Sequence, residues 1–258
     1  MTRWIYIAVS LVLAFAAVLV AGCGGGGGID VGGSTTVQPL AEKWAKAYEG
    51  VDVTVSGGGS SAGVKGVAEG ILDIGAISRD LKSDETDEWP DLVPTIIAYD
   101  GVAIVVNPSN PNEITDLTIE EVRDIFAAGS SSTWTVVSRE EGSGTRETFE
   151  KKVMGEEEIS ASAEFLPSNG AIKQKVAATS NAIGYISLGY VDDDVEAVSV
   201  DGVVCNTDNV RIGTYPISRA LYYVTEGEPE GDVLDFIEFC LSTQGQQIVE
   251  EEGYISIQ

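Results

Sequence analysis

Residues 139–145, with the sequence REEGSGT, have the chemistry of an anion-binding turn. An apolar run at 134–137 that is typical of a strand precedes them, and 146–152 is predicted to be a helix. The first turn of a helix has backbone N–H groups without partners, and the helix dipole favours negative charge there. The turn also offers glycines for close backbone approach, hydroxyl donors and a planar guanidinium, at Gly142 and Gly144, Ser143 and Thr145, and Arg139. The alternative is a capped helix with a surface arginine.

The same order of strand, Gly/Ser/Thr turn and helix occurs three times, with turns at 34–37, 60–63 and 143–145. Ligands of α/β sheets bind at the carboxyl ends of strands, so three such turns would converge on one place. Together they would give an oxyanion several N–H donors, several hydroxyls and one arginine. The nucleotide-binding pattern GxxxxGK[ST] is missing from the sequence, which argues against a phosphate loop of that kind.

Strands alternate with helices along the chain, which predicts the α/β class. Period-two or buried apolar runs predict strands at 51–55, 73–77, 96–99, 102–106, 183–186 and 222–224. Helices are predicted from Pro39, from the turn at 60–63 to about Glu69, and at 119–127, 169–178, 233–241 and 245–251. Asp100 and Gly101 fall between two of the expected strands.

The composition excludes several classes of function. The net charge of −26 argues against nucleic acid and anionic membrane surfaces as partners. An anionic ligand is still compatible with it, because contacts act locally and the global field is screened beyond about 8–10 Å. The chain has no histidine, the commonest general base and transition-metal ligand. We therefore expect no enzyme, no metal site and no cofactor.

The N-terminus has the pattern of a lipoprotein leader. Residues 1–22 hold one base, Arg3, and then an apolar run, which predicts a signal peptide. The sequence VAGC at 20–23 resembles a lipobox and makes Cys23 the predicted lipid-attachment residue, with 23–28 as a glycine-rich tether. The alternative is a retained membrane-spanning helix. In either case we expect an extracytoplasmic protein attached to the outer face of the cell membrane.

Two further cysteines, Cys205 and Cys240, could form a disulfide in that compartment or be separate buried residues. We favour separate residues, because nothing in the sequence brings them together.

The chain also resembles a known family through a series of motifs in the family's order. They are GSTTVQPL at 33–40, GSSAGVK at 59–65, DIGAISR at 73–79, DGVAIVVN at 100–107, Arg139 with SGT at 143–145, and NAIGY at 181–185. In these motifs the chain resembles the phosphate-binding protein of the high-affinity ABC phosphate importer, over nearly the whole of 23–258.

The resemblance implies a two-lobed type II periplasmic-binding-protein fold with a hinge between the lobes. Lobe 1 would take about 29–100 and 218–258, and lobe 2 about 101–217, with chain crossings near 97–106 and 213–223. It also implies a monomer that captures inorganic phosphate in the interlobe cleft. The closed form would then deliver the ion to an ABC permease that a separate ATPase subunit drives.

Carried over by position, the resemblance implies phosphate contacts from Thr35, Thr36, the Val37 N–H, Ser60, Arg139, Ser143, Gly144 and Thr145. Ser78 stands where some members have an aspartate that accepts the proton of the phosphate. An acceptor would disfavour sulfate, which has no proton to donate. That role could pass to Asp80, Asp100 or Glu140, and we favour Asp100.

Three other functions remain open. A binding protein for another tetrahedral oxyanion, such as sulfate, molybdate or tungstate, is the nearest. An enzyme acting on phosphate esters would need a metal cluster or an activated nucleophile, and the sequence offers neither. A structural surface lipoprotein would gain no stability from a ligand.

Overall fold

The computed structural model describes residues 27–129, 131 and 133–258. The predicted signal peptide, the lipid-attachment residue Cys23 and most of the predicted tether lie outside these residues. Within them, no helix is both long enough and apolar enough to cross a membrane.

Strands and helices alternate along the described chain, as predicted. The strands are β1 (Ile29–Gly33), β2 (Val53–Ser56), β3 (Ile74–Ile77), β4 (Leu92–Val106), β5 (Asp116–Leu117), β6 (Thr135–Arg139), β7 (Glu164–Leu166), β8 (Ala182–Ser187), β9 (Glu196–Val200) and β10 (Ser218–Glu226). The α-helices are α1 (Gln38–Ala47), α2 (Ser60–Ala68), α3 (Ser83–Glu88), α4 (Ile119–Ala128), α5 (Gly144–Phe149), α6 (Asn169–Ala178), α7 (Thr207–Arg211), α8 (Gly231–Leu241) and α9 (Thr243–Glu251). A π-helical turn, Glu150–Met154, extends α5, and a 3₁₀ turn, Leu188–Tyr190, follows β8.

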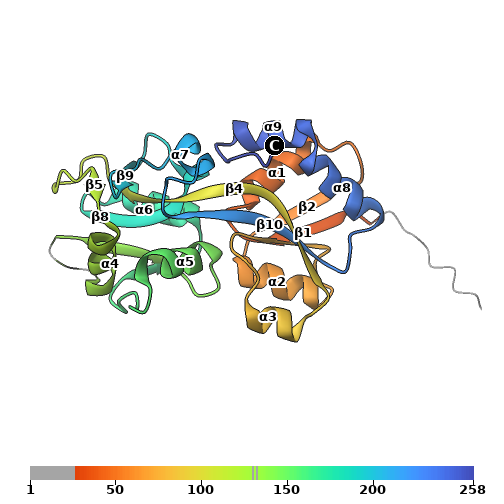
Figure 1. The fold of residues 1–258 in the computed structure, drawn as a ribbon, viewed down its shortest axis with the longest axis horizontal. Helices are drawn as coiled ribbons and strands as arrows, with labels where there is room; N and C mark the ends of the chain where they lie inside the picture. Colours follow the sequence, from red (N-terminus) through yellow and green to blue (C-terminus); the bar gives the residue numbers. More distant parts are fainter. Residues whose placement is uncertain (1–26, 130, 132) are drawn as a thin grey trace, which may run out of the picture.

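One sheet runs through the molecule in the order β2-β1-β3-β10-β4-β8-β6-β7 (Figure 1). β1 pairs in parallel with β2 and β3, and β6 pairs in parallel with β8. The strands β4 and β10, which are antiparallel to each other, join the two halves of this sheet. The predicted turns follow β1, β2 and β6 and therefore start at the carboxyl ends of strands, which is the edge where ligands of such sheets bind.

The expectation of two strands around Asp100 was wrong, because β4 continues through Asp100 and Gly101 without a break. Its pairing with β10 continues there, with Asp100 opposite Arg219 and Gly101 opposite Ser218. This ladder, with the pairing of β4 to β8 that begins at Val102, keeps the two residues in extended backbone.

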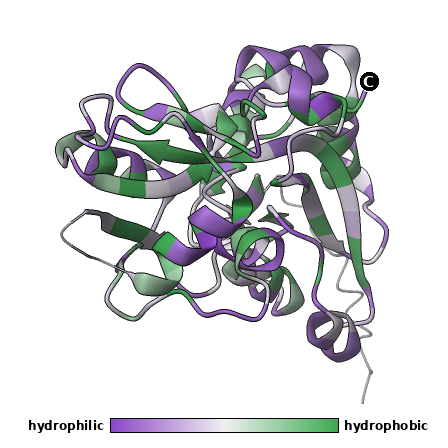
Figure 2. Ribbon diagram, turned by 60° about the vertical axis from the view of Figure 1, so that its left-hand side comes forward, coloured by the Kyte–Doolittle hydropathy of each residue, from purple (hydrophilic) through white to green (hydrophobic). Residues whose placement is uncertain are grey.

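The buried apolar side chains gather in two bodies, which we call lobe 1 and lobe 2. The lobe 1 cores draw on residues between 29 and 98 and between 221 and 254. The lobe 2 core draws on residues between 102 and 217, together with Ile255. Green hydrophobic segments concentrate on the central strands in Figure 2, as expected for sheets whose faces are covered. The exact lobe boundaries and the hinge stay predictions.

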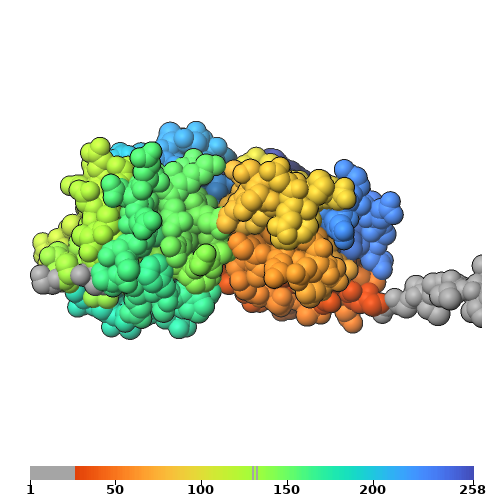
Figure 3. Space-filling view, turned by 90° about the horizontal axis from the view of Figure 1, so that it is seen from below, coloured from red at the N-terminus to blue at the C-terminus, as the bar shows by residue number. Residues whose placement is uncertain are grey.

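The two lobes lie against each other, with the green surface of lobe 2 meeting the orange and yellow surface of lobe 1 in Figure 3. Hydrogen bonds join them, including one from the Ser61 N–H to the Gly142 carbonyl at 3.1 Å. Cys205 and Cys240 are both buried and free, and they belong to the cores of different lobes. The expectation of two separate buried cysteines is confirmed.

Candidate oxyanion site between the lobes

The three predicted turns meet at the contact between the lobes. Thr36, in the turn after β1, lies with its Oγ1 3.0 Å from the Oγ1 of Thr145 at the start of α5. The start of α2 lies equally close, because a Cβ added to Gly144 would be 2.3 Å from the Ser60 Oγ and 2.7 Å from the Ser78 Oγ. Turns from both lobes therefore surround one small region, and a glycine is needed where they touch.

Each turn is formed by its own local chemistry. Ser143 caps α5, and its Oγ accepts a hydrogen bond from the Arg146 N–H at 3.3 Å. The N–H groups of Gly144 and Thr145 come first in α5, so they have no acceptor within the helix. The Ser60 Oγ accepts the Ser78 N–H at 3.1 Å, which joins the starts of α2 and of the segment after β3.

Arg139 ends β6 and is 1% exposed. Its Nε and Nη2 both donate to the carboxylate of the neighbouring Glu140 at 2.8 Å, and Nη2 also donates to the Thr35 Oγ1 at 3.2 Å. Its Nη1 is buried and has no hydrogen-bond partner among the described residues. Leaving a buried guanidinium nitrogen unpaired is costly, so this atom indicates a position for a ligand oxygen.

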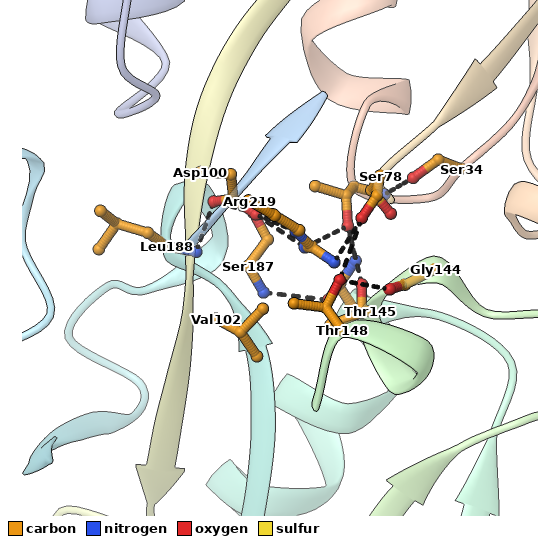
Figure 4. A network of polar contacts seen from close by, with 12 residues as sticks. Ser34, Ser78, Asp100, Val102, Gly144, Thr145, Thr148, Ser187, Leu188 and Arg219 are labelled. Carbon is orange, nitrogen blue, oxygen red and sulfur yellow. Dashed lines mark hydrogen bonds and ion pairs between the residues drawn. The ribbon is translucent and has the colours of Figure 1, made fainter. Parts of the chain in front are cut away.

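A second buried guanidinium lies beside the first, and the sequence analysis missed it. Arg219 in β10 donates to the Asp100 Oδ2 from Nε at 3.0 Å and from Nη2 at 2.7 Å. It also donates to the Ser78 carbonyl at 3.2 Å and to the Thr36 Oγ1 at 3.1 Å (Figure 4). An arginine directly before the apolar run at 220–224 was the signal that could have identified it.

Asp100 is 0% exposed and faces this network, and protein donors engage both of its carboxylate oxygens. Its Oδ1 accepts from the Ser187 hydroxyl at 2.9 Å and the Leu188 N–H at 3.1 Å, while Oδ2 accepts twice from Arg219. Burial raises the pKa of Asp100, and the charge of Arg219 opposes that shift. The pair ties β4 to β10, the two strands that join the lobes.

The other predicted residues are placed as follows. The Val37 N–H donates to the Ser34 carbonyl at 3.1 Å, within the turn itself. Glu140 is paired with Arg139, whereas Asp80 lies at the surface and accepts from the Tyr222 hydroxyl at 2.7 Å. The structure thus brings together Thr35, Thr36, Ser60, Ser78, Arg139, Ser143, Gly144 and Thr145, with Asp100 reached through Arg219. Their roles as ligand contacts stay predictions.

Three more residues that the sequence analysis missed hold the first turn. The Tyr190 hydroxyl donates to the Thr35 carbonyl at 2.6 Å, and the Tyr254 hydroxyl donates to the Thr36 carbonyl at 2.7 Å. Asn169, 0% exposed at the start of α6, donates to the side chains of both threonines. Burial raises the pKa of Tyr190 to about 12, so this phenol keeps its proton at neutral pH.

The charges of the site balance locally, because each arginine is paired with a carboxylate. Arg139 with Glu140 and Arg219 with Asp100 contribute no net charge. An anion would therefore be bound by directed N–H and O–H donors, and the overall acidity of the chain matters little at contact distance. A cavity of about 330 Å³ that is lined by both lobes, including Thr148 and Arg219, lies next to this region.

This architecture is the type II periplasmic-binding-protein fold, in which two lobes share crossing strands and enclose a site between them. The family profile of the PBP superfamily domain matches residues 22–244. The chain belongs to this superfamily and, within it, to the phosphate-binding protein (PstS) family.

Two relatives and one solved structure place the chain in the PstS family. The chain is 34% identical over 248 residues to the phosphate-binding protein PstS of Bacillus subtilis, covering 90% of this chain and 81% of the relative. It is 28% identical to PstS of Borreliella burgdorferi, covering 89% and 90%. A crystal structure of a putative phosphate ABC transporter substrate-binding protein from Clostridium perfringens, with bound phosphate, is 38% identical with a TM-score of 0.84, covering 90% of this chain and all of that one. The predicted fold and family are both confirmed.

Proposed function

We propose that this protein is an extracytoplasmic solute-binding lipoprotein that captures inorganic phosphate between its lobes and delivers it to an ABC permease. The observation that supports this most directly is the Nη1 of the buried Arg139, which lies where turns from both lobes meet and has no partner among the residues that the structure describes. The phosphate named for the Bacillus subtilis relative and for the Clostridium perfringens structure makes that ion the first candidate.

In the proposed mechanism, N–H and hydroxyl donors replace the water shell of the phosphate. Arg139 Nη1, the hydroxyl groups of the turns and the first N–H groups of α5 would contact its oxygens. Closing the lobes excludes solvent, which strengthens each of these contacts. The closed form would dock on a permease driven by an ATPase subunit, while a lipid on Cys23 keeps the monomeric protein at the membrane. No bond of the phosphate is broken, so the protein is not an enzyme.

The alternative is a binding protein for another tetrahedral oxyanion, such as sulfate, molybdate or tungstate. One observation favours keeping it: each oxygen of Asp100, the favoured proton acceptor, already accepts two hydrogen bonds from the protein. Asp100 therefore has no lone pair left for the proton of hydrogen phosphate, the contact that would exclude sulfate, whereas each Glu140 oxygen accepts one hydrogen bond and can accept another.

Calorimetric titration with phosphate, arsenate and sulfate tests the proposal. We expect phosphate and arsenate to bind and sulfate not to bind, and Arg139→Ala to lose at least about 100-fold in affinity because a charge-assisted contact is removed. Arg139→Lys, which keeps the charge without the fork, should lose less. The control is Arg211→Ala, on an arginine side chain that is 45% exposed.

If sulfate binds as tightly as phosphate, the alternative function of a binding protein for other tetrahedral oxyanions is favoured. Absence of binding by any of the three anions to the wild-type protein would overturn the proposal.

A further inference from the structure

Asn169 is held in one orientation at the contact between the lobes. Its Oδ1 accepts the Ser187 N–H at 3.1 Å, and its Nδ2 donates to the Thr36 Oγ1 at 3.0 Å and the Thr35 Oγ1 at 3.4 Å. Rotating the amide would place its NH₂ group against the N–H of Ser187, two donors facing each other. The amide therefore has both of its hydrogens available for the two threonines.

Thr36 receives a second donor from the other side. Arg219 Nη2 donates to the same Oγ1 at 3.1 Å. A hydroxyl has two acceptor lone pairs and one hydrogen, so Asn169 and Arg219 together fill the acceptor capacity of Thr36. Its hydrogen can then only be donated, and the Oγ1 of Thr145 lies 3.0 Å away to accept it. Thr145 is left with its own hydrogen pointing away from Thr36.

Thr35 follows the same rule. Its Oγ1 lies within hydrogen-bonding distance of two nitrogen donors, Arg139 Nη2 at 3.2 Å and Asn169 Nδ2 at 3.4 Å. With both lone pairs engaged, the Thr35 hydroxyl is also a donor. The side chain is 7% exposed and lies beside the guanidinium whose Nη1 has no partner within the described residues.

We propose that Asn169 is a positioning residue which, together with Arg139 and Arg219, fixes the hydroxyls of Thr35 and Thr36 as hydrogen-bond donors. This inference rests on the proposed function, because it describes how the same site recognises its anion. A hydroxyl that is free to rotate could either donate to the ligand or accept the proton of a ligand. Thr35 therefore presents only a hydrogen to the ligand and selects a ligand oxygen that carries lone pairs and no proton. The hydrogen of Thr36 is donated to Thr145, which leaves the hydrogen of Thr145 for the ligand.

The substitution Asn169→Asp tests this directly. It keeps the size of the side chain and an oxygen for the Ser187 N–H, but it replaces the NH₂ group by an acceptor. The Thr35 hydroxyl would then turn toward the new oxygen and away from the ligand, and the Thr36 hydroxyl would turn toward it and away from Thr145. We expect affinity for phosphate to fall by about 100-fold, which is more than for Asn169→Leu, although the leucine alters the local packing more.

A double-mutant cycle separates the direction of the hydroxyl from the added negative charge. In a Thr35→Val background the charge is still present, but that hydroxyl no longer exists to be turned. We expect Asn169→Asp to cost only about 10-fold there, because the two changes act on one interaction. An equal loss in both backgrounds would mean charge repulsion alone and would overturn the inference.

Asn107→Leu is the matched control. Asn107 is another buried asparagine, whose Nδ2 donates to the carbonyls of Val176 and Ala177 at the other end of α6. We expect this variant to melt at a lower temperature but to bind phosphate as the wild type does. Wild-type affinity in Asn169→Asp would also overturn the inference, whereas a wild-type protein that binds no oxyanion would reject the proposed function instead.

Discussion

At the scale of single residues, the site depends on buried groups that hold the ligand-facing groups in place. Tyr185 in β8 is an example: its hydroxyl accepts the Arg139 N–H at 3.2 Å and lies 2.7 Å from the Ser138 Oγ. Its ring stacks on Phe149 of α5 with centroids 4.1 Å apart. One side chain thereby fixes both the arginine strand and the helix that begins at the SGT turn.

Ionisation of Tyr185 should make the protein less stable at alkaline pH. Burial raises its pKa to about 12, whereas an unfolded chain would ionise it near the ordinary value of 10.0. The folded state therefore holds the proton more tightly, and its contribution is complete below about pH 10 and is lost as pH rises toward 12. We expect the melting temperature to fall across this window, as followed by circular dichroism.

Tyr185→Phe supplies the comparison for this pH dependence. It should be less stable by about 1–3 kcal/mol at neutral pH, because the Arg139 N–H loses its acceptor. It should also lose less stability than the wild type between about pH 10 and pH 12. Parallel curves for the two proteins would contradict the assignment.

At the scale of elements, the starts of α2 and α5 approach so closely that the chain needs a glycine between them. The contact lies at Gly144, where an added Cβ would meet the Ser60 Oγ at 2.3 Å. Real Cβ atoms do not approach oxygen that closely, so the Ser60 and Ser78 side chains or the helix starts would have to shift. The distance between these helix starts sets the width of the proposed site.

Gly144→Ala should therefore weaken phosphate binding by about 10- to 100-fold, since small misplacements of donors are costly in a closed site. Gly170→Ala is the matched control, because its Cβ would have no neighbour nearer than 3.8 Å. Gly170 lies inside α6, where alanine should stabilise the protein by about 0.5–1 kcal/mol without changing affinity. Calorimetry measures the phosphate affinity of both variants, and thermal unfolding measures their stability. Unchanged affinity in Gly144→Ala would show that the helix starts do not shape the site.

At the scale of the whole molecule, ion pairs join the lobes beside the site. Glu147 in α5 lies 2.7 Å from the Arg79 Nε and 3.1 Å from the Lys82 Nζ, both of which come from the opposite lobe. Arg79 is also paired with Glu85 of its own lobe at 2.6 Å. The contact between Arg79 and Glu147 is largely shielded from solvent, so it should act more strongly than an exposed pair.

Glu147→Gln should therefore increase the rate of phosphate release by about 3- to 10-fold, while changing the association rate little. Stopped-flow dissociation measures this effect. Glu250→Gln is the control, because Glu250 pairs with Arg211 at the surface, where both side chains are about half exposed. A release rate equal to that of the wild type would show that Arg79 and Glu147 do not hold the lobes together.

The sequence by itself determined the α/β class, most helix positions, the three Gly/Ser/Thr turns and Arg139. These follow from periodicity and from the chemistry of neighbouring residues, which act over a few positions along the chain. The helix predicted at 119–127 is α4, Ile119–Ala128, and the helix predicted at 169–178 is α6. Resemblance to the phosphate-binding family then gave the arrangement in two lobes.

Only the tertiary structure decided which groups pair with which. Arg219 and Asp100 are 119 residues apart, and Asn169 lies more than 130 positions from the threonines it contacts. No local pattern predicts such pairs, because burial and strand pairing create them. These side-chain contacts fill the acceptor positions of Asp100 and are the basis for inferring that the Thr35 and Thr36 hydroxyls are donors. Backbone pairing with β10 keeps β4 as one strand.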